Sequence, residues 1–301
     1  MHLLSAKDLN KEVLFQLIDR AKYFDKQLGK KVHKIAEGKI LATLFYEPST
    51  RTRLSFETSM LRLGGTVIST PDMSNSSAKK GETLKDTGRI VSGFADIIAM
   101  RHYEGGAVLK LSEGSTVPVI NAGDGSNEHP TQVVLDIFTI IKEKGTMDGL
   151  KIALVGDLKF GRTVHSMLQI LCYFDVEVYL VSPDSLKMPK VFIEIAKKNK
   201  LKFIELTNLS DIISEVDVLY QTRVQQERFA SVQEYESLKD KYVIDKKVMS
   251  KAKKDMILMH PLPRIVEITE DVDLDSRAIY FKQAKNGIPA RMAVIEYLLN
   301  L

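Results

Sequence analysis

The chain of 301 residues contains only one cysteine and six histidines, which excludes several kinds of site. A single thiol, Cys172, cannot form an intramolecular disulfide, and a chain without disulfides suits a reducing cytoplasm. The cysteine and the histidines show no metal-ligand spacing, so we expect no metal site. The sequence also lacks a nucleophile elbow and the serine, histidine and aspartate order of hydrolases.

Long apolar runs and a strong net charge are also missing. No stretch approaches the roughly 18 apolar residues that a membrane span requires. Charged residues from Lys7 to Glu12 interrupt the N-terminal region and exclude a signal-peptide pattern. The net charge is only +4, and no interleaving of arginine with aromatic residues marks a nucleic-acid groove. We therefore expect a cytoplasmic protein that binds neither membranes nor nucleic acids and uses a few cations for small acidic ligands.

The chain does contain short β-rich runs that alternate with helical patterns, in two series. Such alternation predicts parallel sheets with helices on both faces, so we expect an α/β protein with two doubly wound domains. The second series begins at Lys151. The predicted strands of the first series are Ile40–Phe45, Thr66–Ser69, Asp96–Met100 and Val117–Ile120.

The length of the chain is typical of two domains of about 150 residues each. We expect a first domain over residues 1–135 and a second over residues 136–286. A final helix, predicted over Pro289–Asn300, would return at about 287–301 to pack on the first domain.

The segment after the first predicted strand holds the strongest functional signal. Ser49 to Arg53 reads Ser-Thr-Arg-Thr-Arg, and the amphipathic run that follows predicts a helix over Thr50–Leu63. A helix start presents unpaired backbone N–H groups and the positive end of the helix dipole. Hydroxyls and a guanidinium in the same turn make an anion site, and phosphate is the anion that fits best. A plain helix cap would need neither arginine.

Polar residues also follow two other strands of the first series. Arg101 comes directly after the third predicted strand, where a surface ion pair is the plainer explanation. A glycine-rich loop that begins at Asn121 leads to His129 and Gln132, on one side of a predicted helix start. Ligands of open parallel sheets bind at the carboxyl ends of the strands, which singles out these positions as candidate binding residues.

The second series shows the same arrangement. The segment Gly156–Thr163 follows a strand and places Arg162 at a helix start. It lacks the G-x-G-x-x-G spacing of a dinucleotide loop, so we reject NAD and expect no cofactor. Arg223 and Gln225 follow a later strand of this series.

The last predicted strand is followed by the loop His260–Arg264, in which two prolines fix the backbone around Leu262 so that its carbonyls can face a ligand. Together the clusters supply many cationic and neutral donors without an obvious nucleophile. Such a site suits a reaction in which the substrate brings its own nucleophile and the protein stabilises charge.

Four of these segments together resemble the catalytic chains of the aspartate carbamoyltransferase family. They are Ser49–Arg53, His129–Gln132, Asp157–Thr163 and His260–Arg264, in the family's order and spacing over nearly the whole chain. The first two mark carbamoyltransferases generally. An ornithine enzyme would be expected to carry a cysteine in the last loop and a Ser-Met-Gly segment. Here the loop reads His-Pro-Leu-Pro, which favours aspartate as the acceptor.

The resemblance implies that carbamoyl phosphate and L-aspartate give N-carbamoyl-L-aspartate and phosphate, in de novo pyrimidine biosynthesis. It implies that the first domain binds carbamoyl phosphate and the second binds aspartate. Closure between the domains would bring amine and carbonyl together and exclude water. The resemblance implies that the phosphate is bound by Ser49, Thr50, Arg51, Thr52 and Arg101, and that the carbonyl is polarised by Thr52, Arg101 and His129. It implies that the carbamoyl amide contacts Gln132 and the carbonyls of Leu262 and Pro263. The aspartate carboxylates would contact Arg162, Arg223 and Gln225.

In this family a serine and a lysine of a polar loop reach the active site of a neighbouring subunit. Lys80 matches the lysine, as a catalytic and aspartate-binding residue, and either Ser76 or Ser77 could be the serine. The resemblance therefore implies a homotrimer with shared active sites. It further implies that such chains can join a separate zinc-bearing regulatory chain. It suggests a cis Leu262–Pro263 bond, which the sequence itself leaves open.

Two alternatives remain at this point. One is a carbamoyltransferase that uses another amino acceptor, which an assay with aspartate, ornithine and other amines would separate. The other is a catalytically silent ligand-sensing or scaffold chain. The second is disfavoured because every expected functional position is occupied, whereas a silent relative would be expected to have lost some.

Overall fold

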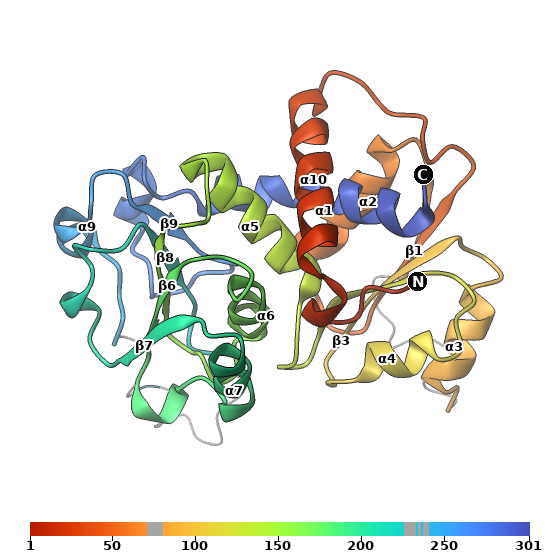
Figure 1. The fold of residues 1–301 in the computed structure, drawn as a ribbon. Coiled ribbons are helices and arrows are strands. Elements are labelled where there is room, and N and C mark those ends of the chain that lie inside the picture. The colour runs from red at the N-terminus through yellow and green to blue at the C-terminus, as the bar shows by residue number, and fades with distance from the viewer. Residues whose placement is uncertain (71–80, 226–232, 234–235, 237–240) are drawn as a thin grey trace. The chain divides into compact units, whose positions relative to one another are not determined.

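The structure is a computed structural model that describes residues 1–70, 81–225, 233, 236 and 241–301 (Figure 1). The chain divides into two compact units. Unit 1 comprises Met1–Phe138 and Asn286–Leu301, and unit 2 comprises Thr139–Lys285. Each unit is built on its own sheet.

The sheet of unit 1 has four strands in the order β2-β1-β3-β4, and every neighbouring pair is parallel. The sequence of β1, Ile-Leu-Ala-Thr-Leu-Phe, is buried at all but its first position, as expected for a strand covered on both faces. The strands are β1 (Ile40–Phe45), β2 (Thr66–Thr70), β3 (Ile97–His102) and β4 (Val119–Asp124).

Alternate side chains of β1 pack on opposite faces of this sheet. Leu44 belongs to an apolar cluster with Leu111 of α4 (Ala107–Ser112). Thr43 points to the other face, where its hydroxyl donates to Glu57 of α2 over 3.1 Å. Helices therefore cover both faces of a parallel sheet, which confirms the doubly wound prediction for this unit.

The helices of unit 1 follow the predicted amphipathic patterns. The first begins after Asn10, whose side chain accepts a hydrogen bond from the backbone N–H of Val13, and its apolar stripe from Leu14 to Phe24 is buried. The helical segments are η1 (Ala6–Asp8), α1 (Lys11–Gln27), α2 (Thr50–Arg62), α3 (Leu84–Val91) and α4, together with parts of α5 (Pro130–Lys144) and α10 (Tyr280–Leu299).

The sheet of unit 2 has five strands in the order β7-β6-β5-β8-β9, again with every neighbouring pair parallel. Its central strand β5 carries the apolar run that the sequence predicts, and side chains of β5, β6, β8 and β9 share one buried cluster with Tyr280. The strands are β5 (Lys151–Val155), β6 (Glu177–Val181), β7 (Lys202–Leu206), β8 (Val218–Gln221) and β9 (Ile257–Met259).

Helices cover this second sheet as well. The helix α6 (Arg162–Leu171) is buried at every position from Val164 to Leu171, so it lies deep in the unit. The parallel sheet with its helical cover confirms the α/β prediction for unit 2. The other helical segments are α7 (Lys190–Lys198), α9 (Lys246–Lys251), η4 (Asp184–Leu186), η5 (Leu209–Asp211) and η7 (Glu270–Leu274).

Two strand predictions are wrong at their carboxyl ends. β3 continues through Arg101, because this residue pairs in parallel register with Phe45 of β1. β4 continues to Asp124, where the sequence predicts a loop. The polar side chain of Asn121 can be buried in this strand because it donates to the Leu4 carbonyl (2.8 Å) and to Asp124 (2.9 Å).

The predicted start of the final helix is also wrong. Proline is favoured at the first position of a helix, which made Pro289 the expected start. In the structure α10 begins nine residues earlier, at Tyr280, and Pro289 lies inside it. An internal proline removes one backbone hydrogen bond, and the buried side chains on both sides of it, such as Tyr280 and Met292, favour a continuous helix.

Strand order reverses once in each sheet, and these two positions are the expected ligand sites of doubly wound sheets. In unit 1 the reversal lies between β1 and β3, which are neighbours although β2 comes between them in the chain. In unit 2 it lies between β5 and β8. The sequence-predicted residues follow these strands.

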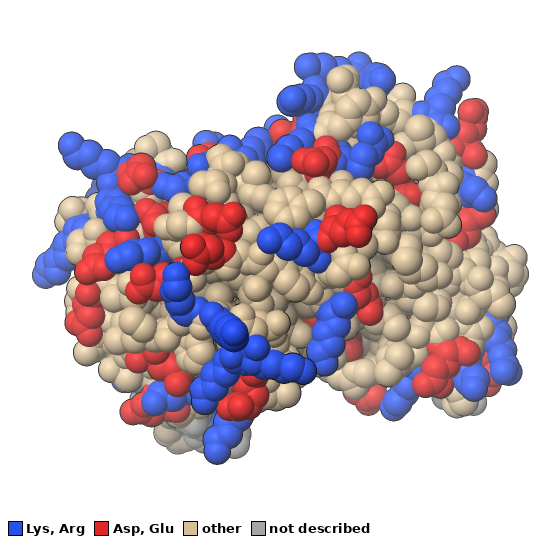
Figure 2. Space-filling model, viewed as in Figure 1, with Lys and Arg blue, Asp and Glu red and all other residues tan. Residues whose placement is uncertain are grey.

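The surface of the molecule carries both signs of charge. On the face shown in Figure 2, acidic and basic side chains are interspersed over much of the surface. None of the helices in the described ranges is both long and apolar enough to cross a membrane.

Candidate active site

The start of α2 has the character of an anion site. Ser49 is the N-cap residue in extended conformation, yet its side chain accepts no capping hydrogen bond from the helix. The first turn contains no acidic residue, although acids are favoured there. Thr52 is 8% exposed at the inner side of the same turn. Hydroxyls, backbone N–H groups and the helix dipole are thus available to an external anion.

The two arginines of this turn have different surroundings. Arg53 forms an ion pair with Glu57 one turn further along α2, with 3.6 Å between Nε and Oε1. Partial burial lowers the pKa of the Arg51 guanidinium, which remains a cation at neutral pH because arginine titrates far above it. Arg51 is therefore the better candidate for binding an anion at the helix start.

Arg101 lies beside this turn at the carboxyl end of β3. Its backbone carbonyl accepts the Tyr46 N–H over 2.9 Å, which ties the end of β3 to the chain just after β1. Its side chain is 12% exposed, and Nη2 donates to Glu47 over 3.0 Å. Glu47 holds the guanidinium in place and is also an anion with which an incoming phosphate would compete.

The start of α5 supplies the remaining predicted residues of unit 1. His129 directly precedes Pro130, the first residue of the helix, and is buried. Thr131 Oγ1 lies 3.5 Å from His129 Nδ1. The side chain of Gln132 is buried as well, and its Nε2 donates to Asp136 Oδ1 over 3.0 Å. This helix start follows β4, so it lies at the same edge of the sheet as the α2 turn.

In unit 2 a buried carboxylate shapes the loop that precedes α6. Asp157 Oδ1 accepts the backbone N–H groups of Lys159 (3.1 Å) and Phe160 (2.9 Å). Burial raises the pKa of Asp157, and these hydrogen bonds act in the opposite direction. The loop ends at Gly161, the N-cap of α6, so Arg162 occupies the first position of the helix.

The chain after β8 is joined to this loop. Thr222 Oγ1 accepts the backbone N–H of Asp157 over 3.1 Å, and Gln225 Nε2 donates to the Phe160 carbonyl over 3.0 Å. Gly156 permits the close approach, because a Cβ at this position would lie 2.4 Å from the Thr222 carbonyl oxygen. The loops that carry Arg162 and Arg223 are therefore held together at the strand reversal of unit 2.

The loop after β9 is organised by His260. Its Nδ1 accepts the Leu262 N–H over 2.8 Å, so the proton of the neutral ring lies on Nε2, which donates to Glu267 over 2.9 Å. Burial lowers the pKa of His260, in agreement with a neutral ring. The Leu262–Pro263 peptide bond is cis, which the sequence had left open.

Arg264 is the last residue of the predicted loop. Its Nη2 pairs with Asp273 Oδ2 over 2.5 Å. It also donates to Tyr280 Oη over 2.8 Å. Its guanidinium is therefore used within unit 2.

Several residues that hold the site together were missed by the sequence analysis. Three of them are carboxylates that accept a hydrogen bond from a residue of a predicted segment: Glu47 from Arg101, Asp136 from Gln132 and Glu267 from His260. The fourth is Asp157, which belongs to a predicted segment but had no predicted role. For Asp136 a signal existed, because it lies four residues after Gln132 and therefore on the same side of the helix. The predicted Lys80, Ser76 and Ser77 lie outside the described residues.

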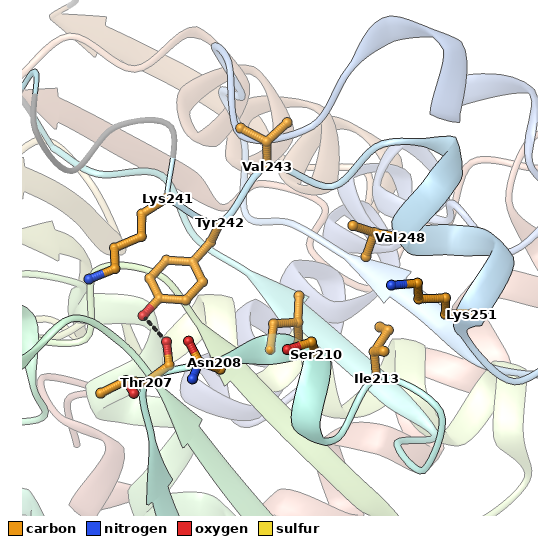
Figure 3. Close-up of a pocket in the computed structure, with 10 residues that line it drawn as sticks. Thr207, Asn208, Ser210, Ile213, Lys241, Tyr242, Val243, Val248 and Lys251 are labelled. Atoms are coloured by element: carbon orange, nitrogen blue, oxygen red, sulfur yellow. Dashed lines mark hydrogen bonds between the residues drawn. The ribbon is translucent and has the colours of Figure 1, made fainter.

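Unit 2 also has a cavity of about 250 Å³ beside η5 and α9 (Figure 3). Tyr242 Oη donates to the Thr207 carbonyl over 2.7 Å at its wall, and burial raises the pKa of Tyr242 to about 12. Val248 and Lys251 of α9 lie on its other side. The lining residues include none of the predicted site residues, so this cavity is not the candidate active site. Within the described ranges, no group of three or more histidine, cysteine, aspartate or glutamate side chains could hold a metal ion.

The fold and these clusters define a doubly wound α/β protein with cationic residues at the strand reversal of each unit. Residues 1–142 match the family domain described as aspartate/ornithine carbamoyltransferase, carbamoyl-P binding domain. Residues 148–298 match the companion Asp/Orn binding domain. The chain therefore belongs to the aspartate/ornithine carbamoyltransferase family.

Within this family the chain is similar to proteins named for aspartate. It is 53% identical over 300 residues to the aspartate carbamoyltransferase catalytic subunit of Methanocaldococcus jannaschii, covering 99% of this chain and 97% of that protein. A solved structure of the M. jannaschii catalytic subunit has a TM-score of 0.92, at 53% identity over 99% of this chain and 98% of that one. Trypanosoma cruzi aspartate transcarbamoylase, solved with carbamoyl phosphate and aspartate, has a TM-score of 0.91 at 38% identity, covering 98% and 94%.

Proposed function

We propose that the chain is an aspartate carbamoyltransferase, which transfers the carbamoyl group of carbamoyl phosphate to L-aspartate in de novo pyrimidine biosynthesis. The observation that carries this proposal is the pair of cationic sites at the two strand reversals. The site of unit 1 lies in the residues that match a carbamoyl-P binding domain. The site of unit 2 lies in the residues that match an Asp/Orn binding domain.

Unit 1 would bind carbamoyl phosphate by its phosphate. Ser49, Thr50 and Thr52 supply hydroxyls and backbone N–H groups at the start of α2, and Arg51 and Arg101 supply charge. Arg101 would exchange its bond to Glu47 for one to the ligand. The start of α2 has neither an acidic side chain nor a side-chain cap, so the bound phosphate would complete the hydrogen bonding of its first backbone N–H groups.

Three groups would polarise the carbamoyl carbonyl: Thr52, Arg101 and His129. When the Thr131 hydroxyl donates to His129 Nδ1, the ring proton lies on Nε2, and this N–H can donate to the carbonyl oxygen. The amine of aspartate forms the new C–N bond while the carbonyl electrons move to the oxygen. Donors fixed in advance around that oxygen lower the barrier.

The tetrahedral intermediate collapses by breaking the bond between carbon and the bridging phosphate oxygen, whose electron pair leaves with the phosphate. The phosphate accepts the amine proton, so no side chain is required as a general base. The carbamoyl amide would be held by Gln132 and by the carbonyls of Leu262 and Pro263. His260 supports that loop through its bond to the Leu262 N–H.

Unit 2 would bind the two carboxylates of aspartate. A planar guanidinium grips a carboxylate through two parallel hydrogen bonds, so a dicarboxylate calls for two arginines. Arg162 and Arg223 are the candidates, with Gln225 beside them, and Asp157 orders the loops that carry them. An ornithine side chain is cationic and would be repelled by this pair, which supports aspartate as the acceptor.

We further infer a homotrimer that works in the cytoplasm and shares its active sites through Lys80 and Ser76 or Ser77 of a neighbouring subunit. Unit 1 exposes large apolar side chains on α2 and β2, and on and just after α3, that suit contacts with other copies. These side chains are Leu54, Leu61, Ile68, Ile90 and Phe94.

A separate regulatory chain fits the name "catalytic subunit" of the relatives.

The test is an assay of product formation with aspartate, ornithine and other amines as acceptors. We expect N-carbamoyl-L-aspartate from aspartate only, and tight inhibition by a bisubstrate mimic that carries a phosphonate and a dicarboxylate. Turnover with a non-acidic acceptor alone would identify a different carbamoyltransferase. Binding of carbamoyl phosphate without turnover of any acceptor would support a silent sensor.

A further inference from the structure

We propose that Asp136 and Arg291 are positioning residues that orient the Gln132 side-chain amide, with its oxygen toward the amino group of carbamoyl phosphate. The proposal rests on the proposed function, because it concerns how the same site recognises the carbamoyl group. It concerns residues of unit 1 only, on α5 and α10.

The bond between Gln132 and Asp136 sets the orientation of the amide. An amide has a donor end and an acceptor end, whereas a carboxylate can only accept. Nε2 of Gln132 therefore faces Asp136, at 3.0 Å, and Oε1 faces the other way. An amide oxygen is the end that can accept a hydrogen bond from the carbamoyl NH2 group. If the amide were rotated, the NH2 group of Gln132 would face the carbamoyl NH2 group, and no hydrogen bond could form between these two donors.

Arg291 supplies the charge that a buried carboxylate needs. Asp136 is fully buried, and burying an unpaired charge is costly. Arg291 is 3% exposed, and Asp136 is the opposite charge that acts on it. Burial lowers the pKa of Arg291 to about 10, so the guanidinium stays protonated at neutral pH. An opposite charge of this kind favours the carboxylate form of Asp136, which can only accept a hydrogen bond from Gln132.

A glycine makes room for this arginine. Gly287 lies one turn before Arg291 in α10, where a Cβ would come within 2.3 Å of Arg291 Nη1 and 3.4 Å of Leu135 Cδ2. Glycine is, after proline, the least favourable residue inside a helix. A side chain at position 287 would require the guanidinium to shift, so the glycine leaves room for the observed placement of Arg291.

Arg291 also links α5, which carries Gln132, with α2, whose start is the proposed phosphate site. Its Cζ lies 5.0 Å from the ring centre of Phe56 in α2, a cation–π contact. A second link runs from Ser59 Oγ of α2 to the Ile288 carbonyl of α10, at 3.0 Å. The start of α2 would bind the phosphate and the start of α5 the carbamoyl amide. Arg291 therefore contacts the helix proposed to bind the phosphate and acts electrostatically on Asp136 of the helix proposed to bind the carbamoyl amide.

Asp136→Asn tests the proposal. The guanidinium of Arg291 carries only donors, so it would attract the oxygen of the introduced amide and leave the new NH2 group facing Gln132. Gln132 would then turn its oxygen toward that NH2 group and its nitrogen toward the ligand. We expect the affinity for carbamoyl phosphate to fall about 10- to 100-fold.

The decisive measurement compares three ligands of the same site in wild type and variant. Acetyl phosphate has a methyl group where carbamoyl phosphate has NH2, and inorganic phosphate lacks the acyl group altogether. We expect Asp136→Asn to change the dissociation constants of acetyl phosphate and inorganic phosphate less than about threefold. Equal weakening of all three ligands, or no change for carbamoyl phosphate, would overturn the proposal.

Two further variants keep the test informative if Asp136→Asn folds poorly. Gly287→Ala displaces the guanidinium, and we expect it to reduce the preference for carbamoyl over acetyl phosphate about 3- to 10-fold. Arg20→Met is the matched control: Arg20 also pairs with a carboxylate of α10, Glu296 (2.7 Å), and lies 5.0 Å from the ring centre of Phe24. It should lower thermal stability without changing that preference. An unchanged preference in Gly287→Ala, or an equal loss in Arg20→Met, would contradict the proposal.

Failure of the proposed function would look different. In that case wild-type protein would show no binding of carbamoyl phosphate and no product from aspartate. Failure of the present proposal would leave wild-type binding and turnover intact while the ligand preference of the variants stayed unchanged.

Discussion

At the scale of single residues, buried charged and ionisable groups hold the segments that carry the proposed substrate-binding residues. Asp157 has one oxygen on two backbone N–H groups of its own loop, and its backbone N–H reaches Thr222 after β8. Arg162 and Arg223 follow directly from these two segments. The proposed dicarboxylate site would therefore need less ordering of its backbone when the substrate binds.

We predict that Arg223→Ala raises the KM for aspartate about 30- to 100-fold while the KM for carbamoyl phosphate changes little. The reason is the loss of charge-assisted hydrogen bonds to one carboxylate. Arg277→Ala is the control, because Arg277 binds Asp275 (2.6 Å) and the Lys253 carbonyl (3.0 Å) within unit 2. Steady-state kinetics decide, and an unchanged aspartate dependence in Arg223→Ala would remove this arginine from the site.

His260 gives a prediction on pH. Burial lowers its pKa below the ordinary value of 6.5, and its neutral ring binds Leu262 and Glu267. Burial alone would raise the pKa of Glu267, but the bond from His260 and backbone N–H groups outweighs it and lowers that pKa. Both groups therefore stabilise the fold fully at neutral pH. The His260 contribution is lost as the pH falls from 6.5 through the folded pKa, because the unfolded chain binds the proton first.

We expect His260→Asn to be less stable than wild type by about 1–3 kcal/mol at pH 7.5. The difference should shrink as the pH falls below 6.5, by up to about 1.4 kcal/mol per pH unit, because only the wild type loses the histidine contribution. Denaturant unfolding at pH 7.5, 6.5 and 5.5 measures the difference, in which the other histidines cancel. A gap that stays constant or widens on acidification would contradict this reading of His260.

At the scale of elements, the helix start is the recurring device. The segments α2, α5 and α6 each begin just after a strand and carry predicted residues in or beside their first turn. The start of α2 lacks both a side-chain cap and an acid, so its N–H groups and dipole are available to a ligand. A ligand that completes such a helix start gains several hydrogen bonds with little rearrangement.

The two arginines of α2 form a matched pair for this idea. We predict that Arg51→Ala weakens carbamoyl phosphate binding about 10- to 100-fold, and more than aspartate binding. Arg53→Ala should change it less than about threefold, because Arg53 is engaged with Glu57 at 3.6 Å and such helix pairs contribute little. Direct binding measurements compare the two variants. An equal effect, or a larger one for Arg53, would contradict the assignment.

At the scale of the whole molecule, several large apolar side chains of unit 1 are exposed. Phe94 is 62% exposed and Leu61 is 54% exposed, both in unit 1. Clusters of exposed large apolar residues mark interaction surfaces. This supports the proposed assembly of identical chains, and Lys80 would then reach a neighbour's site.

Mixing two inactive variants tests whether the sites are shared. In a trimer that combines Arg51→Ala with Lys80→Ala chains, about a third of the sites would join an intact Arg51 from one chain to an intact Lys80 from its neighbour. We therefore expect activity to recover on mixing, after subunit exchange has been verified by mass. Continued inactivity of exchanged trimers would show that each chain contains a self-contained site.

The amino-acid sequence by itself determined the local features of this protein. Alternating apolar runs and helical patterns predicted two parallel sheets, because strand and helix periodicity are properties of short segments. For the same reason, the residue types of the Ser49–Arg53 turn predicted an anion site at a helix start. The positions of most elements were predicted to within a few residues, and the α2, α5 and α6 starts were all found.

The tertiary structure decided what depends on residues distant in the chain. The parallel pairing of Arg101 with Phe45 lengthened β3, and the buried side chains around Pro289 extended α10 back to Tyr280. The contact of Arg291 with Phe56 joins residues more than two hundred positions apart. No local pattern contains such contacts, since they arise only when separate helices pack. The sequence therefore predicted which groups bind the ligands, and tertiary packing determines the contacts that orient some of them, such as Arg101 on Glu47.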